Sequence, residues 1–203
     1  MKASSIIILT IIFLFIVLTS EGLYANSHAK VYGLKVKGFQ LGMTKQEALQ
    51  SLHVIKENFQ LDNDSISDMG NHVNLKFKED GDYIFLVNFI CETRYGSNFV
   101  HSIAFYPRLF NVKWKEGQQI YPAFLAYVKA FFDTFKLKYD EKNIVTDIIG
   151  SITLKEDDYD IIFDRFGGTI AFKLNQNIIN DILMPYKLNE ERQRVQEVNP
   201  NFR

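Results

Sequence analysis

Two stretches of this 203-residue chain resemble each other: KEDGDYIFLVNF at residues 78–89 and KEDDYDIIFDRF at residues 155–166. Aligned without gaps at an offset of 77 residues, they share five identities over twelve positions. Each holds an acidic turn between β-forming runs, and Asp80-Gly81 in the first is the strongest short signal for a β-hairpin. The sequence therefore predicts the same strand–turn–strand unit twice.

More strands surround the predicted hairpins. Val73, Leu75 and Phe77 alternate with polar residues, as in a half-buried strand that precedes the first turn. A further strand follows each hairpin, and the triplet Ile-Ala-Phe recurs in both, at 103–105 and 170–172. In chain order the expected strands are 73–78, 83–90, 99–106, 149–155, 159–166 and 169–174, with Gly167-Gly168 as the last turn.

A predicted helix precedes each set of strands. Thr44-Lys45-Gln46-Glu47 is a capping box, and Pro122 suits the first turn of the second helix. Both helices carry apolar residues at spacings of three and four, which favours one buried face on each. These residues are Ala48, Leu49, Leu52, Ile55 and Phe59 in the first helix, and Tyr121, Phe124, Leu125, Val128, Phe131, Phe132 and Phe135 in the second. We expect Phe124, Val128 and Phe135 to be buried against the second sheet.

This order of elements predicts an α+β fold of two tandem α-β-β-β units, with antiparallel sheet packed on helices. The units are expected at residues 26–110 and 111–187. Strand 83–90 is apolar on both faces, so an interface between the units is expected to bury Ile84, Leu86 and Ile90. A short final helix is expected at 178–184, and residues 188–203 form a polar tail that we expect to fray from residue 190.

The N-terminus has the features of an export signal. Met1-Lys2 precedes an uncharged segment, and its apolar part, Ile6–Leu18, would span about 20 Å as a helix, short of a membrane's roughly 30 Å. We expect cleavage of residues 1–25, which makes the mature chain periplasmic or secreted. The alternative is an uncleaved anchor, since Ala3–Ser20 could just reach across, and only then would the protein contact a membrane.

The segment Gly38-Phe39-Gln40-Leu41-Gly42-Met43-Thr44-Lys45-Gln46-Glu47-Ala48 resembles the opening of the SmpA/OmlA (BamE-type) small envelope lipoproteins. The resemblance implies a small exported α+β domain in the bacterial envelope. Those lipoproteins carry an acylated Cys after the signal, whereas the single Cys here is Cys91. A tandem pair of such units is similar to the β-lactamase-inhibitor-protein architecture, in which a sheet face grips a partner protein.

Composition and motifs exclude several classes of function. The formal charge is −1, from 23 basic and 24 acidic residues, which argues against a nucleic-acid binder. The histidines show no metal-ligand spacing, and the chain lacks nucleotide-binding and hydrolase motifs, so no metal, cofactor or catalytic residue is predicted. Cys91 and His101 suggest a thiol nucleophile, but Cys91 ends an apolar strand, which favours a buried, inert thiol.

Two acidic turns remain as a weak prediction of partner-binding residues. They comprise Glu79, Asp80 and Asp82 in the first unit and Glu156, Asp157 and Asp158 in the second. Carboxylates there could bind a cation or face a basic protein partner, although acidic residues are also common in solvated turns. The leading hypothesis is a non-enzymatic binding protein, an inhibitor or assembly module, that holds another envelope or secreted protein. The alternatives are an envelope-polymer hydrolase that uses carboxylates or Cys91, and a membrane-anchored structural protein.

Overall fold

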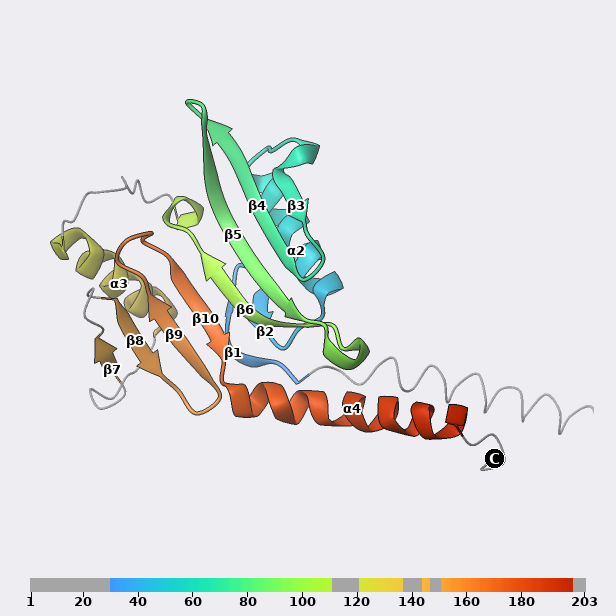
Figure 1. The fold of residues 1–203 in the computed structure, drawn as a ribbon. Coiled ribbons are helices and arrows are strands. Elements are labelled where there is room, and N and C mark those ends of the chain that lie inside the picture. Colours follow the sequence, from blue (N-terminus) through green and yellow to red (C-terminus); the bar gives the residue numbers. More distant parts are fainter. Residues whose placement is uncertain (1–29, 111–120, 137–143, 147–150, 199–203) are drawn as a thin grey trace, which may run out of the picture. The chain divides into compact units, whose positions relative to one another are not determined.

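An antiparallel sheet of eight strands is the centre of the fold in the computed structural model (Figure 1). Residues 30–110, 121–136, 144–146 and 151–198 are described, so the predicted signal peptide lies outside them. Met1–Lys30 and Val31–Arg203 are separate units, and all the elements described belong to the second. The α+β class and the antiparallel sheet are thus as predicted.

The strand order across the sheet is β3-β4-β5-β6-β10-β9-β8-β7. The bounds are β3 Ile66–Asp68, β4 His72–Glu79, β5 Asp82–Glu92, β6 Phe99–Phe105, β7 Ile144–Thr146, β8 Ile152–Lys155, β9 Tyr159–Phe163 and β10 Ile170–Leu174. All six predicted strands are present, although β9 ends at Phe163, three residues early. The edge strands β3 and β7 were not predicted, since three residues are too few to display a period.

Residues paired across neighbouring strands point to the same side of the sheet. The side whose paired residues are buried is the core side. The pairs arrange themselves in two rows of buried side chains that cross the inner strands. One row is Val73, Phe89, Ile103, Phe172, Ile161 and Leu154, and the other is Leu75, Val87, Phe105, Ile170 and Phe163.

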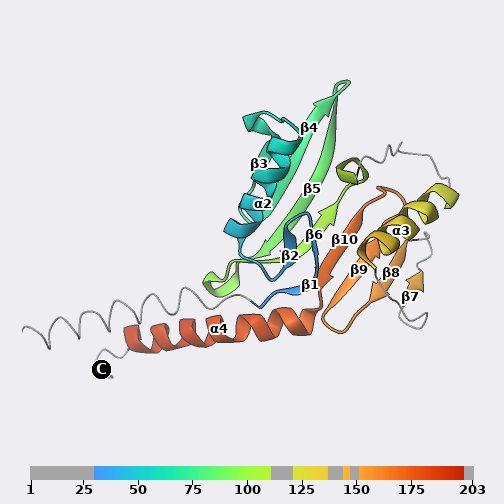
Figure 2. The same cartoon turned by 180° about the vertical axis from the view of Figure 1, so that it is seen from behind.

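Two helices cover this core side, α2 (Lys45–Asn58) and α3 (Tyr121–Phe135), as Figure 2 shows. The predicted capping box starts α2: the Thr44 side chain accepts a hydrogen bond from the Glu47 amide, and the Glu47 carboxylate accepts one from the Thr44 amide at 2.7 Å. Ala48, Leu52 and Ile55 are buried, which confirms the predicted apolar stripe.

Helix α3 packs its aromatic side chains on the second half of the sheet. Phe131 makes edge or tilted ring contacts with Phe163 and Phe172, at centroid distances of 5.9 and 6.1 Å. Val128 is buried, as predicted. The side chains of Phe124 and Phe135 lie outside the described residues.

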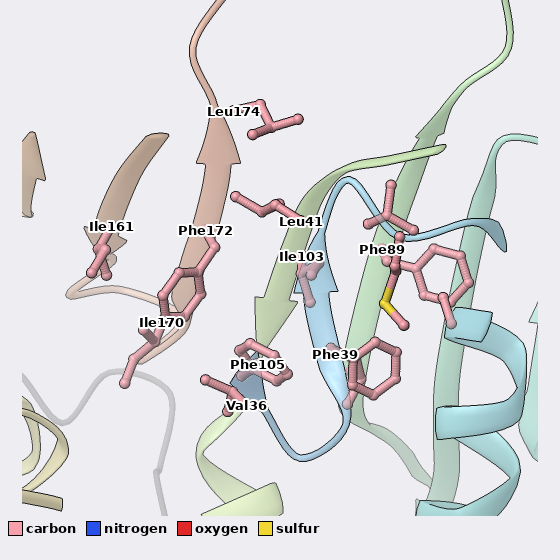
Figure 3. Packing of buried hydrophobic residues seen from close by; sticks show 14 of the residues in the cluster. Val36, Phe39, Leu41, Phe89, Ile103, Phe105, Ile161, Ile170, Phe172 and Leu174 are labelled. Carbon is pink, nitrogen blue, oxygen red and sulfur yellow. The ribbon is translucent and has the colours of Figure 1, made fainter. Parts of the chain in front are cut away.

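A small hairpin, β1 (Tyr32–Val36) and β2 (Phe39–Leu41), fills the core side between the two helices (Figures 2 and 3). Neither of its strands was predicted from the sequence. Its turn, Lys37-Gly38, has positive φ at both residues, the geometry that suits the twist of two-residue hairpins. Phe39 is fully buried, with ring centroids 6.1 Å from Phe89 and 6.0 Å from Phe105.

The segment after β2 ties the hairpin to the sheet. Gly42 has a φ of 84°, its amide donates to the Val100 carbonyl at 2.8 Å, and the Val100 amide donates to Met43 at 2.8 Å. A side chain at Gly42 would be strained in this conformation. The motif that carries the resemblance therefore acts here as a structural joint that leads into α2.

The expected burial of strand 83–90 is only partly right. Leu86 is buried, but Ile84 and Ile90 are half-buried. Leu86 is the extra residue of a β-bulge, because Leu75 pairs with Val87 and Lys76 with Phe85. The bulge turns Leu86 and Val87 both toward the core, so local geometry buries Leu86 and no interface between units is needed.

The last helix is longer than predicted. α4 runs from Gln176 to Val198 through Pro185, so the tail expected to fray from residue 190 is helical to Val198. Ile179 and Leu183 anchor the first half in the core, whereas Leu188 and Val195 are exposed. The amphipathic pattern ends near Met184, which is why the sequence indicated a short helix.

Candidate binding surface

The side of the sheet opposite the helices is not covered by any described element (Figure 1). We call it the open face, and define it by the paired residues that point to it. One row takes a single residue from each strand in turn: Ser67, Asn74, Asn88, Ala104, Ala171, Ile162, Thr153 and Val145. Beside it lie His72, Ile90, Ser102, Lys173, Asp160 and Lys155, and toward the first hairpin Lys76, Phe85, Lys78 and Tyr83.

The centre of the open face is built from small side chains. Ala104 of β6 pairs with Ala171 of β10, and the neighbouring position on β6 is Ser102. All three are partly exposed, although they sit on the two central strands. The backbone at the middle of the sheet can therefore be approached closely by another molecule.

Aromatic and basic side chains gather beside this centre, on β4 and β5. Tyr83 is 55% exposed, with Lys76 Nζ 4.2 Å and Lys78 Nζ 5.1 Å from its ring centroid. Phe85 stacks on Tyr106 at 5.5 Å. Two ammonium groups near one ring hold the tyrosine in place by cation–π attraction, and more than half of its surface stays exposed.

A polar group adjoins the aromatic residues. Asn88 Nδ2 lies 2.6 Å from Nε2 of His72, and the Asn88 side chain also hydrogen-bonds Tyr106. Burial and the Asp164 carboxylate raise the pKa of Tyr106, while the bond to Asn88 lowers it. This part of the open face thus presents the hydrogen-bonded side chains of His72 and Asn88 together with the rings of Phe85 and Tyr106.

The charges of the open face are unbalanced. Two carboxylates lie beside the rows defined above: Glu92, which follows Cys91 on β5 and is paired with Arg94, and Asp164, which acts on Tyr106. The charged residues of the rows themselves are Lys76, Lys78, Lys155, Lys173 and Asp160, four cations against one anion. None of the five forms a salt bridge within the described residues. A chain with a net charge of −1 therefore carries a local positive excess here.

The predicted acidic residues lie elsewhere, and the fold does not bring them together. Strands β4 and β8 run in opposite directions, so the turn at 79–82 and the turn at 156–158 are at opposite ends of the sheet (Figure 1). Glu79 pairs with Arg108 at 2.8 Å. Asp80 and Asp82 are exposed at the tip of the first hairpin.

The second acidic turn is tied to the start of α4. The Asn175 side chain donates to the carbonyls of Glu156 and Asp157, at 3.1 and 3.0 Å, and its amide donates to Asp158 at 3.0 Å. These contacts use backbone oxygens and not the carboxylates, and the carboxylates of Glu156 and Asp158 add to the burial that raises the pKa of Tyr159. The six residues of the two turns do not form a common site.

Cys91 lies on the core side of β5 and is 2% exposed. Burial raises its pKa to about 11, with a smaller opposing effect from Lys45. The sulfur is therefore protonated at neutral pH and is a poor nucleophile.

His101 is the extra residue of a second bulge, where Ile90 pairs with Ser102 and Cys91 with Val100. Burial lowers its pKa, the Glu92 carboxylate opposes that effect, and the nearby cations Lys173 and Arg94 add to it. Among the described residues its Nδ1 has no hydrogen-bond partner. His101 Nδ1 therefore makes no hydrogen bond with the Cys91 thiol, and the hydrolase hypothesis gains no support from this pair.

Two further properties concern the described part of the chain alone. Within it, no three side chains of His, Cys, Asp or Glu converge as metal ligands would. Its helices are also too short or too polar to cross a bilayer.

The open face was not predicted from the sequence, although part of its pattern is visible there. The alternation of Asn74, Lys76 and Lys78 with Val73, Leu75 and Phe77 was assigned to one half-buried strand. The sequence does not show that Asn74 lies in one row with Ala104 and Ala171, nor that this row crosses all eight strands. Compared with protein-family models, with curated proteins and with solved structures, the chain finds no match.

Proposed function

We propose that this chain is a non-enzymatic binding protein of the bacterial envelope that holds another protein on its open face. A row of eight paired side chains, of which Asn74 alone is buried and which has alanines at its middle, carries the proposal. Aromatic side chains such as Tyr83 and Phe85 are enriched in protein–protein interfaces, and the small residues beside them let a partner approach the backbone closely. An antiparallel sheet commonly leaves one face solvated, so the support comes from the side chains on this face and not from its exposure.

We further propose that the fold is a tandem duplication. The strand order supports this, because β3 to β6 and β7 to β10 each form four neighbouring strands in chain order, and the last strands of the two sets, β6 and β10, pair with each other. Each half is preceded by one helix, α2 or α3. The repeated triplet supports it too, since Ile103-Ala104-Phe105 pairs antiparallel with Ile170-Ala171-Phe172.

The proposal includes export, for which the sequence of residues 1–25 is the support. The resemblance of residues 38–48 to SmpA/OmlA proteins, and of a tandem pair to β-lactamase-inhibitor proteins, suggests an inhibitor or an assembly role. The hydrolase alternative gains no support from the protonated, buried Cys91.

Affinity capture from envelope extracts tests the proposal with a matched pair of variants. Ala171→Arg fills the centre of the open face, whereas Ala130→Arg makes the same change at an exposed position of α3. Both should fold, which a thermal melt checks. We expect a specific protein to be retained by the wild type and by Ala130→Arg, and lost by Ala171→Arg.

A partner retained equally by both variants would show that docking occurs elsewhere. Failure to recover any specific protein under several growth conditions would contradict the binding function itself.

A further inference from the structure

We infer that the open face receives an extended acidic segment of a partner polypeptide. The inference rests on the proposed function and adds the chemistry of the partner. It also reverses the initial expectation of a basic partner, which relied on the acidic turns.

The lysines carry the argument through their number and distribution. Lys76 and Lys78 lie on β4, Lys173 on β10 and Lys155 on β8, so they are distributed over six neighbouring strands. Strands are about 4.8 Å apart, which separates the first and last lysines by about 24 Å. One phosphate or one carboxylate cannot bridge that distance, so the fitting ligand carries several anionic groups along its length.

The lysines are also free to bind. Lys78, Lys155 and Lys173 are exposed, and within the described residues Lys76 and Lys78 make cation–π contacts with the rings of Tyr83 and Phe85. Lys155 and Lys173 flank Asp160 across the strands but form no salt bridge with it within the described fold, so all four ammonium groups lose little when an external carboxylate approaches. The positive excess also attracts an acidic partner over a distance of about 8–10 Å at ordinary salt.

The groups between the lysines favour a polypeptide over other polyanions. Asp160 lies directly between Lys173 and Lys155, where a uniformly charged nucleic acid would place a phosphate against a carboxylate. Phe85, Ile90 and Ile162 are half-buried on the same face and need apolar contacts that a phosphate backbone does not offer. A peptide can alternate acidic and apolar side chains and match both.

An anionic membrane fits less well for a related reason. Ser102, Ala104 and Ala171 have short side chains, so no apolar group protrudes from the centre of the face. Insertion into lipid needs protruding apolar groups. The hydrogen-bonded pair His72 and Asn88 on this face also calls for a partner with polar groups of its own.

Selection from a displayed library of random peptides tests this on the full chain. Eight strands span about 34 Å, and an extended peptide rises about 3.3 Å per residue, so peptides of about twelve residues suffice. We expect selected peptides to be enriched in Asp and Glu and depleted in Lys and Arg. Their affinity should fall as salt is raised.

Three variants locate the binding and its charge dependence. Lys78→Glu/Lys155→Glu/Lys173→Glu reverses three exposed lysines of the open face, and Lys35→Glu/Lys37→Glu/Lys187→Glu reverses three exposed lysines elsewhere. Both triple variants have the same net charge. We expect the first to weaken binding of selected peptides about tenfold or more and the second to change it less than about twofold. Ala171→Arg should abolish binding.

The possible failures are distinguishable. Selected peptides that depend on Ala171 but show no acidic enrichment would overturn the acidic segment and leave the open face as a docking surface. Acidic peptides weakened equally by both triple variants would reveal only non-specific attraction and would also overturn it. Peptides insensitive to Ala171→Arg would contradict the proposed function as well. Tighter binding of a short DNA duplex or of vesicles of anionic phospholipid would replace the peptide with that ligand.

Discussion

Ala104 of β6 and Ala171 of β10 lie directly opposite each other at the centre of the sheet. On either side of this pair, Ile103 faces Phe172 and Phe105 faces Ile170. The alanines point to the open face and their four neighbours to the core. The pairing of β6 with β10, which we call the joint, therefore contributes both to the stability of the fold and to its proposed binding surface.

Truncation of Phe172 tests the core side of this joint. Its ring is 2% exposed and contacts Phe105 at 5.9 Å and Phe131 at 6.1 Å. We expect Phe172→Ala to lower the free energy of unfolding by about 3–5 kcal/mol, because it removes these contacts and leaves a cavity. Urea unfolding measures this, with exposed Lys173→Ala as a control that changes it by less than about 0.5 kcal/mol. Equal effects of the two substitutions would contradict the assigned sides of β10.

The cap of α2 makes a smaller, local contribution. Thr44→Ala removes the acceptor for the Glu47 amide, so we expect a loss of about 1 kcal/mol. Thr93→Ala is the matched control, since the Thr93 side chain makes no capping hydrogen bond. If urea unfolding gives the same small change for both, the capping box does not contribute to stability.

Cys91 should be inert in the folded protein. With its pKa raised by burial from 9.0 to about 11, the thiol stays protonated and inaccessible, so a thiol-specific reagent at pH 8 should modify only the urea-unfolded chain. The same shift predicts that stability falls with rising pH, from about pH 9, where the unfolded thiol ionises, through about pH 11. Cys91→Ala should remove that part of the pH dependence. Rapid labelling of the native chain would revive the hypothesis of a reactive thiol.

Glu92 has the opposite linkage. Its hydrogen bonds with Arg94 lower its pKa from 4.5 to about 2, despite some burial. The pair therefore stabilises the fold above about pH 4.5 and loses that contribution as the pH falls toward 2. We expect NMR titration of the Glu92 carboxyl to show the low pKa, and Arg94→Ala to return it toward 4.5. An unchanged titration in the variant would assign the shift to the backbone amides.

The signal-peptide prediction needs only the mass of the mature protein. If residues 1–25 are removed on export, mass spectrometry of protein recovered outside the cytoplasm should give a chain that begins at Asn26. Retention of Met1 in membrane fractions would favour the uncleaved anchor.

Local signals in the sequence predicted much of this fold. Asp80-Gly81 forms a tight turn with positive φ at both residues, and Thr44 caps α2, because turns and caps depend on a few adjacent residues. The Lys37-Gly38 turn has the same geometry, but its flanking strands of five and three residues were too short to stand out.

Sequence identity was less reliable than turn chemistry. Phe89 and Phe166 are aligned identities, yet Phe89 is fully buried and Phe166 is 51% exposed in the turn after β9. The bulge at Leu86 shifts the first strand relative to the second, so the alignment holds at the hairpin tips and fails beyond them. The open face could not be predicted either, because it depends on how distant strands are ordered.

The joint between β6 and β10 has one more property: it is its own complement. Since Ile-Ala-Phe pairs with Ile-Ala-Phe about the two alanines, a strand carrying this triplet can pair in the same register with a second copy of itself. A chain that ended after β6 would expose that edge. The same edge of a second identical chain would be complementary to it and would extend it to a symmetric eight-stranded sheet. Joining both halves in one polypeptide makes this pairing intramolecular, so it no longer depends on protein concentration.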